Sequence, residues 1–215
     1  MSARENILAR IRARQGKPDV ASVDERVAVQ SYVGSRPQHA RPRADWEPLA
    51  RFRERVLGLS STVEEVGSLT AAPAAIARYL SSNSLPLTAV CWPEFEGLSW
   101  QAAGMEVAAR PARDSDLVGI TGAFCAIAET GTLMTVTGPR TPATVSLLPE
   151  THIAIVPASR IVRGMEEAWQ LVRDELGQPP RAVSFISGPS RTADIEQTVT
   201  LGAHGPYRVH IVLTR

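Results

Sequence analysis

Polar side chains that could do chemistry gather in one segment near the end of the sequence, ISGPSRTADIEQTVTLGAHGP at residues 186–206. The segment follows a short apolar run, VSFI at 183–186, which predicts a buried strand that ends in a glycine–proline turn. A strand that leads through a glycine turn into a helix directs free main-chain N–H groups at one point, and such points bind anions. Arginine can add two parallel hydrogen bonds to a carboxylate or phosphate. We therefore predict a small-anion site formed by Gly188, Ser190, Arg191, Thr192 and Asp194.

The same segment also fits a plainer role. Ser190, Thr192 and Asp194 are all favoured helix N-cap residues, so they can equally begin a well-capped surface helix. His204 lies in the glycine-rich turn GAHGP, where glycines on both sides, including Gly205, let a ligand approach the main chain closely. Imidazole exchanges protons near neutral pH. We predict that His204 is a general acid or base and that Gly205 contacts the ligand.

A second segment, GITGAFCAIAETGTLMTVT at residues 119–137, places one carboxylate between two apolar runs. A carboxylate in a stretch otherwise suited to burial is costly unless it is paired or used. We predict that Glu129 contacts a ligand or acts catalytically, and that Thr130 and Gly131 line the same site. Arg140 has two interpretations: it binds the ligand, or it pairs with Glu129, which then has only a structural role.

The composition limits the classes of function. The 215 residues are 44% apolar and 21% charged with a net charge of +1, which suits a globular protein and argues against nucleic-acid binding. No dinucleotide or P-loop phosphate motif is present. Cys91 and Cys125, the only cysteines, lack metal-ligand spacing, so the chain itself is predicted to hold neither an iron–sulfur cluster nor a metal. Since no secretory signal and no run of the ~20 apolar residues that a membrane span needs is visible, we expect a cytoplasmic protein without membrane contact.

Residues 1–59 are predicted to form a helical N-terminal arm. The pattern Ser2-x-x-Glu5 predicts a capping box at the start of a helix over 2–15, and the apolar spacing predicts another helix over 46–57. Residues 1–55 hold 12 basic and 7 acidic residues, whereas the remaining 160 hold 11 and 15. A basic arm on a slightly acidic body can bind the main domain, a partner, or a second copy in a homodimer.

Residues 60–215 are predicted to form one α/β domain. Strands are expected at 62–66, 87–92, 133–136, 153–156, 183–186 and 209–213 and helices at 73–80 and 164–176, whereas 117–128 fits either a helix or a connector. Such alternation indicates a mainly parallel sheet with helices on both faces. Ligands of these sheets bind beyond the carboxyl ends of the strands, so we expect Glu129, Ser190 and His204 to meet at one such edge.

Four motifs, GITGAFCAIAETGT, LLPETHIAIVP, FISGPSRTADIEQT and GAHGP, occur in this order between residues 119 and 206. In sequence and spacing they resemble the lactate-utilisation protein C family, also called the LUD-domain family, over roughly residues 60–215. The resemblance implies the fold of ribose-5-phosphate isomerase, glucosamine-6-phosphate deaminase and the CoA transferases. It also implies a cytoplasmic accessory subunit in the oxidation of L-lactate to pyruvate, which works beside iron–sulfur lactate-utilisation proteins and holds no cofactor of its own.

Within that resemblance, Glu129, Ser190, Arg191 and Thr192 are expected to bind a small organic anion. Two other hypotheses stand beside it. In CoA transferases a glutamate attacks an acyl-CoA and forms a thioester, so Glu129 suggests a stand-alone acyl-transfer enzyme, or one that isomerises a sugar phosphate, although further CoA-transferase signatures are absent. In the third hypothesis the chain is an assembly module whose basic arm binds the partner.

Overall fold

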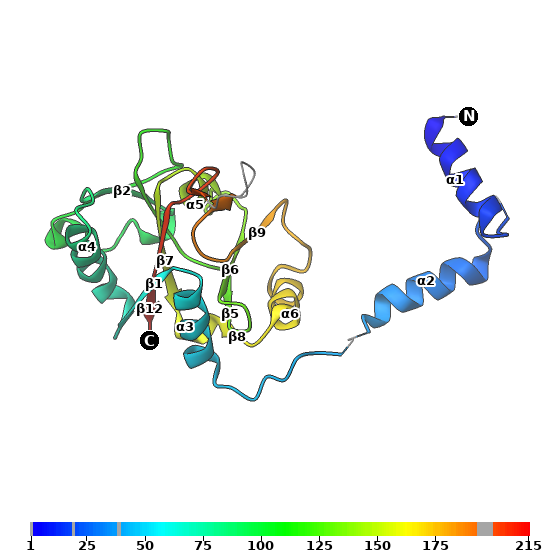
Figure 1. Cartoon of the computed structure of the whole chain (residues 1–215), viewed down its shortest axis with the longest axis horizontal. Helices are drawn as coiled ribbons and strands as arrows, with labels where there is room; N and C mark the ends of the chain where they lie inside the picture. Colours follow the sequence, from blue (N-terminus) through cyan, green and yellow to red (C-terminus); the bar gives the residue numbers. More distant parts are fainter. Residues whose placement is uncertain (1, 19, 38–39, 193–199) are drawn as a thin grey trace. The chain divides into compact units, whose positions relative to one another are not determined.

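The computed structural model describes residues 2–18, 20–37, 40–192 and 200–215 (Figure 1). The chain divides into two compact units, Met1–Arg43 and Ala44–Arg215. Helix α3 (Pro48–Gly58) belongs to the second unit, where its side chains Phe52 and Val56 are fully buried. From the sequence, this helix was predicted to belong to an arm that ends at residue 59, whereas α3 is a packed element of the second unit.

The first unit contains two helices, α1 (Ala3–Arg14) and α2 (Val23–Ser35). The predicted capping box at the start of α1 is present: Glu5 N donates to Ser2 Oγ at 3.3 Å, and Ser2 N donates to a Glu5 carboxylate oxygen at 2.6 Å. No residue described in either helix is buried. Glu25 joins the helices through ion pairs with Arg12 at 3.1 Å and Lys17 at 2.7 Å.

The second unit is built on a six-stranded sheet whose paired strands all run parallel, as the sequence predicted. The adjacent inner strands β12 and β7 are almost wholly buried and contain central apolar runs, which is typical of a parallel sheet covered on both faces. In spatial order the strands are β1 (Thr62–Val66), β12 (Arg208–Thr214), β7 (Thr151–Pro157), β4 (Val118–Thr121), β2 (Thr88–Cys91) and β3 (Glu106–Ala109).

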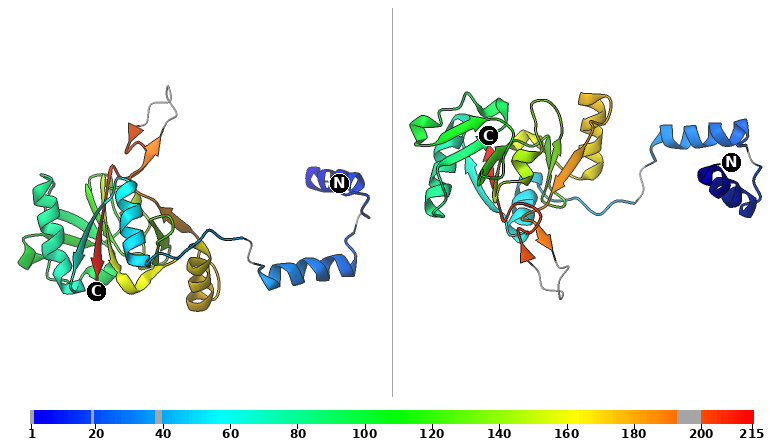
Figure 2. Two further views of the ribbon diagram at one scale, coloured as in Figure 1. Left: turned by 60° about the horizontal axis from the view of Figure 1, so that its bottom comes forward. Right: turned by 90° about the horizontal axis from the view of Figure 1, so that it is seen from above.

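The central sheet is covered by a layer on each face (Figure 2). Alternate side chains of β7 bury against these two layers. Ile153 and Ile155 of β7 share a core with helix α4 (Ala72–Ser82). Ala154 and Val156 point to the other face, which is covered by α3 together with part of a second sheet. The short helices are α5 (Thr144–Leu147), η1 (Leu69–Ala71), η2 (Pro93–Phe95), η3 (Gln101–Ala103) and η4 (Ala158–Arg160).

The second sheet corrects the sequence analysis, because two strands predicted for the parallel sheet belong to it. It has the order β8 (Ile161–Val162), β5 (Cys125–Ile127), β6 (Thr132–Val136) and β9 (Val183–Ile186). Its β5–β6 and β6–β9 pairs are antiparallel. Helix α6 (Met165–Leu176) packs on this sheet. Strand β9 was predicted to be buried, but it lies at the sheet edge and is partly exposed.

The region after β9 also differs from the prediction of a capped helix. Ser190 is followed by a short strand, β10 (Arg191–Thr192), which pairs antiparallel with β11 (Thr200–Leu201). The predicted N-cap role of Ser190 is therefore wrong, because the two residues that follow it are extended and paired with a second strand. A helix capped by Thr192 would fall on residues outside the described ones. Asp194, the third predicted cap and a predicted ligand contact, lies outside the described residues.

Candidate functional site

Two glycine turns far apart in the sequence meet at the C-terminal end of α3. Gly131 has φ +69° and Gly188 has φ +84°, a region that favours glycine. A Cβ added to Gly131 would lie 2.7 Å from Arg55 Cβ, and one added to Gly188 would lie 2.5 Å from Leu59 O. Both turns therefore pack directly on the last turn of the helix, and only glycine allows this approach.

A chain of three hydroxyl groups links the same two turns. Thr130 Oγ1 lies 2.7 Å from Thr132 Oγ1, which in turn lies 2.7 Å from Ser187 Oγ. Thr132 is buried, whereas Thr130 and Ser187 are exposed. Each hydroxyl can donate one hydrogen bond and accept others, so the chain holds the turns together and leaves a hydroxyl on the surface at each end.

Glu129 lies on the rim of this cluster. It lines a cavity of about 410 Å³ together with Thr130 and the end of α3, including Glu54 and Arg55. Its main-chain N–H donates to Arg163 O at 2.9 Å. The side chain is half-buried, as a carboxylate that works in a site would be.

Arg140 lies elsewhere, near the carboxyl end of strand β2 in the central sheet. The Arg140 charge acts on Glu94, a residue just beyond β2, and lowers the pKa of that carboxyl against the stronger effect of burial, which raises it. The cation in the Glu129 cavity is instead Arg55. Arg55 was missed because the sequence analysis assigned its helix to the arm.

Arg191 holds the main chain that follows α3. Its guanidinium donates to Leu59 O at 3.2 Å and to Ser60 Oγ at 2.7 Å. Ser60 has φ +65°, an uncommon conformation for a residue with a side chain, and the hydrogen bond to Arg191 stabilises it. The arginine predicted to bind an anion thus fixes the wall of the Glu129 cavity, and Thr192 continues into β10.

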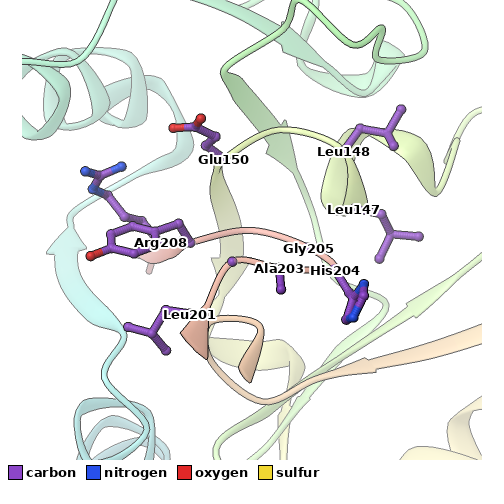
Figure 3. Close-up of a pocket in the computed structure, with 10 residues that line it drawn as sticks. Leu147, Leu148, Glu150, Leu201, Ala203, His204, Gly205 and Arg208 are labelled. Carbon is purple, nitrogen blue, oxygen red and sulfur yellow. The ribbon is translucent and has the colours of Figure 1, made fainter. Parts of the chain in front are cut away.

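His204 and Gly205 line a different and larger cavity of about 660 Å³ at the amino ends of β7 and β12 (Figure 3). Ser190 is not a lining residue of this cavity but supports its loop, because Ser190 N donates to Pro206 O at 2.9 Å and Gly202 N donates to Ser190 O at 2.9 Å. The other lining residues, which the sequence analysis did not select, are Leu147, Leu148, Glu150, Leu201, Gly202, Ala203, Tyr207 and Arg208. The motif LLPETH was the signal that could have found three of them.

The two cavities share no lining residue. Both lie at the amino-end side of the central sheet, since α3 leads into β1 and the loop 202–207 leads into β12. The prediction that Glu129, Ser190 and His204 meet at the carboxyl ends is therefore wrong in two respects: Glu129 and His204 line separate cavities, and both cavities lie at the other end of the sheet. It failed because it treated β9 as a strand of the parallel sheet, whereas β9 runs antiparallel to β6 in the small sheet and reaches the opposite end.

Several titratable side chains are structural. His152 is fully buried with its Nε2 atom 2.7 Å from Thr121 Oγ1, and burial lowers its pKa to about 4. Burial raises the pKa of the Cys91 and Cys125 thiols to about 11. In the part of the chain that the structure describes, no three His, Cys, Asp or Glu side chains are grouped so that they could bind a metal ion. No helix described there combines the length and apolar character that a membrane span requires.

Comparison with known proteins gives a consistent result. The family model of the LUD domain matches residues 20–214. The chain is 40% identical over 141 residues to the Lactate utilization protein C of an Exiguobacterium species, covering 64% of this chain and 61% of that protein. It is 37% identical over 128 residues to the Lactate utilization protein C of Bacillus subtilis, covering 57% and 52%. The chain thus spans somewhat more than half the length of these relatives.

A solved structure is also similar. The crystal structure of a DUF162 family protein from Deinococcus radiodurans aligns with a TM-score of 0.60 and 26% sequence identity. The alignment covers 81% of this chain and all of that chain. The similarity extends over most of the chain and supports the α/β architecture described above.

Proposed function

This chain belongs to the LUD-domain family, and from that premise we propose that it is an accessory component of the oxidation of L-lactate to pyruvate in the cytoplasm. The observation that carries the proposal is the 40% identity over 141 residues to a relative named Lactate utilization protein C. The chain's two cysteines are too few for the four thiolates that an iron–sulfur cluster commonly takes, so we place the electron-transfer centre in a partner.

The surface that we propose for this iron–sulfur partner is the rim of the His204 cavity. Four large apolar side chains around it are exposed to between 37% and 50% of their full area, namely Leu147, Leu148, Leu201 and Tyr207. Exposed apolar side chains that gather at one cavity are typical of a protein-binding surface. Arg208 stacks on the Tyr207 ring at 4.8 Å, and arginine and tyrosine are both enriched at interfaces.

Growth on L-lactate tests the proposal. Deleting the gene should abolish growth on L-lactate and leave growth on glucose unchanged, and the wild-type gene should restore it. The variant Leu148→Asp should fail to restore growth and should no longer co-purify with the iron–sulfur partner. Leu69→Asp is the matched control, because Leu69 is similarly exposed and lies on η1, away from the cavity. Normal growth of the deletion strain on L-lactate, with the partner genes intact, would refute the role.

A second candidate function has one observation in its favour. Glu129 shares its cavity with Arg55 and adjoins the three linked hydroxyls, an arrangement that suits a nucleophilic carboxylate. Glu129 would then attack the carbonyl of an acyl-CoA and form a mixed anhydride with release of the CoA thiolate. The thiolate would attack the glutamyl carbonyl, which frees the carboxylate of the original acyl group and leaves a CoA thioester on Glu129, ready to pass coenzyme A to an acceptor carboxylate. Incubation with acyl-CoA followed by mass spectrometry should then show an adduct that the Glu129→Gln variant lacks. An unmodified wild-type protein would dismiss this function.

A further inference from the structure

The connections of the central sheet diverge between the carboxyl ends of β2 and β4. These strands are neighbours, with Cys91 opposite Ile120. The chain leaves β2 towards β3 on one side, and it leaves β4 through the small sheet towards β7 on the other side. In open parallel sheets, ligands bind at this kind of divergence, outside the carboxyl ends of the strands.

The carboxyl group of Glu94 lies at this point, directly over Gly122. A Cβ added to Gly122 would lie 2.6 Å from Glu94 Oε1, 3.4 Å from Phe95 Cζ and 3.6 Å from Trp92 Cζ3. The missing side chain at Gly122 therefore leaves the space that the carboxyl occupies next to two aromatic rings. Glu94 is exposed as a whole residue, but its carboxyl lies against these rings, and the resulting partial desolvation raises its pKa because desolvation disfavours the charged form.

Arg140 is held near the same carboxyl by the turn that follows β6. Trp92 Nε1 donates to Pro142 O at 3.1 Å, which ties the turn to the end of β2. Thr141 Oγ1 donates to Val136 O at 2.7 Å and closes the turn. Arg140 itself is exposed, and its charge acts on Glu94. The turn, tied to Trp92, thus places the Arg140 charge within electrostatic reach of the Glu94 carboxyl.

A buried polar pair fixes the floor of this cluster. Thr121 Oγ1 donates to Gly122 O at 2.9 Å and lies 2.7 Å from His152 Nε2. His152 Nδ1 is buried and has no hydrogen-bond partner. The position of the Gly122 main chain, and with it the space for Glu94, is therefore set by side chains from two neighbouring strands, β4 and β7.

We propose that Glu94 and Arg140 form a binding site for a small 2-hydroxy or 2-oxo carboxylic acid. Arg140 binds the carboxylate of the ligand through two hydrogen bonds. Glu94, in its protonated form, donates a hydrogen bond to the oxygen on the neighbouring carbon. The site rests on the geometry above, whereas the choice of L-lactate and pyruvate as ligands rests on the proposed function.

Calorimetry of the full chain with L-lactate, pyruvate and propionate tests the site. Propionate lacks the second oxygen, so it should bind more weakly than the other two. Arg140→Gln should weaken the binding of lactate and pyruvate about tenfold or more, since a charge-assisted hydrogen bond is lost. Gly122→Ala should have a similar effect, because the new Cβ displaces the flexible end of Glu94 rather than main chain. Arg181→Gln, an exposed arginine just before β9, is the matched control and should bind like the wild type.

The pH dependence of binding tests the part assigned to Glu94. Affinity should fall as the pH rises through the raised pKa of Glu94, because the ionised carboxylate repels the ligand and no longer donates. Glu94→Gln should keep the affinity and lose this fall, since an amide donates at every pH. Cys91 and His152, with pKa values of about 11 and about 4, stay neutral between about pH 5 and pH 8.

The binding site and the proposed function can be refuted independently of each other. No heat of binding with any acid, or equal affinities of the wild type and Arg140→Gln, would overturn the site, even if the deletion strain fails to grow on lactate. Binding that depends on Arg140, found in a protein whose deletion leaves growth on lactate intact, would support the site and refute the proposed function. Circular dichroism of each variant shows whether a loss of binding comes from unfolding instead.

Discussion

Two buried histidines should make the stability of this protein fall at mildly acidic pH. Burial lowers the pKa of His152 and of His210 from 6.5 to about 4. The unfolded chain therefore takes up protons at a higher pH than the folded chain, and the stability is complete above the unfolded value and lost as the pH falls towards the folded value. Each histidine should cost about 2 kcal/mol of unfolding free energy near pH 5, and about 3 kcal/mol at pH 4.

Urea unfolding at about pH 7.5 and about pH 5 measures this loss. The two histidines together should lower the unfolding free energy by about 4 kcal/mol between these conditions. His210→Phe should halve the loss, because phenylalanine does not titrate and can keep the stacking on Tyr79, whose ring lies 3.8 Å from that of His210. The His210→Phe substitution removes the hydrogen bond between Thr62 and His210 at both pH values, so this loss does not change the difference in unfolding free energy between them. His204→Gln is the control, since His204 is exposed.

Paired carboxylates cannot produce the same result. Arg110 holds the pKa of Asp116 below its usual 3.8, and Arg160 holds that of Glu175 below its usual 4.5, so both are almost fully ionised in either state near neutral pH and lose their contribution at lower pH. An unfolding free energy that is flat between the two conditions, or an unchanged loss in His210→Phe, would refute the assignment to the buried histidines.

Two further predictions follow from the packing. Gly131→Ala should lower the unfolding free energy by about 2 kcal/mol or more, because a Cβ would meet Arg55 as well as strain the backbone; Gly177→Ala, with φ +70° and open space, should cost only about 1 kcal/mol. Equal losses in urea unfolding would show that the contact with α3 is unimportant. The Cys91 and Cys125 thiols, buried with pKa values of about 11, should react with a thiol reagent only after denaturation, and fast labelling of the folded protein would contradict this.

The sequence predicted most elements because their signals are local. The capping residues before α1 and the apolar spacing of α6 lie within single segments, and both helices match the prediction within one or two residues. The apolar run at 153–156 lies inside β7, as a strand buried on both faces requires. These patterns depend only on residues that are close together in the chain, so they can be recognised without knowledge of the fold.

The second sheet was missed because strand partners are not local. Leu133 of β6 pairs with Ile186 of β9, which lies more than fifty residues further along the chain. A short apolar run fits a central parallel strand and an antiparallel strand packed under a helix equally well. The segment 117–128 was left open for the same reason, and it contains one strand of each sheet, β4 and β5.

The candidate site shows the same limit. Gly131 and Gly188 were predicted to be ligand-site residues in two separate segments, and they do lie together. However, the group that approaches them in this structure is the main chain and Cβ atoms of α3, a helix that the sequence analysis had assigned to the arm. Glycine in a turn indicates a close approach, but the sequence does not say of what.

The amino ends and the carboxyl ends of the central strands carry different chemical groups. At the amino-end side, leucines and a tyrosine are exposed around an open cavity, which suits the large and partly apolar surface of a protein. At the carboxyl ends of β2 and β4, the Glu94 carboxyl lies next to aromatic rings and feels the charge of Arg140, which suits a small acid. If the subunit binds its partner at one end of the central strands and its ligand at the other, Leu148→Asp should disrupt only the partner complex. Arg140→Gln should then disrupt only ligand binding. If either variant impairs both properties in the folded protein, the two ends are not independent and the division of roles proposed here is wrong.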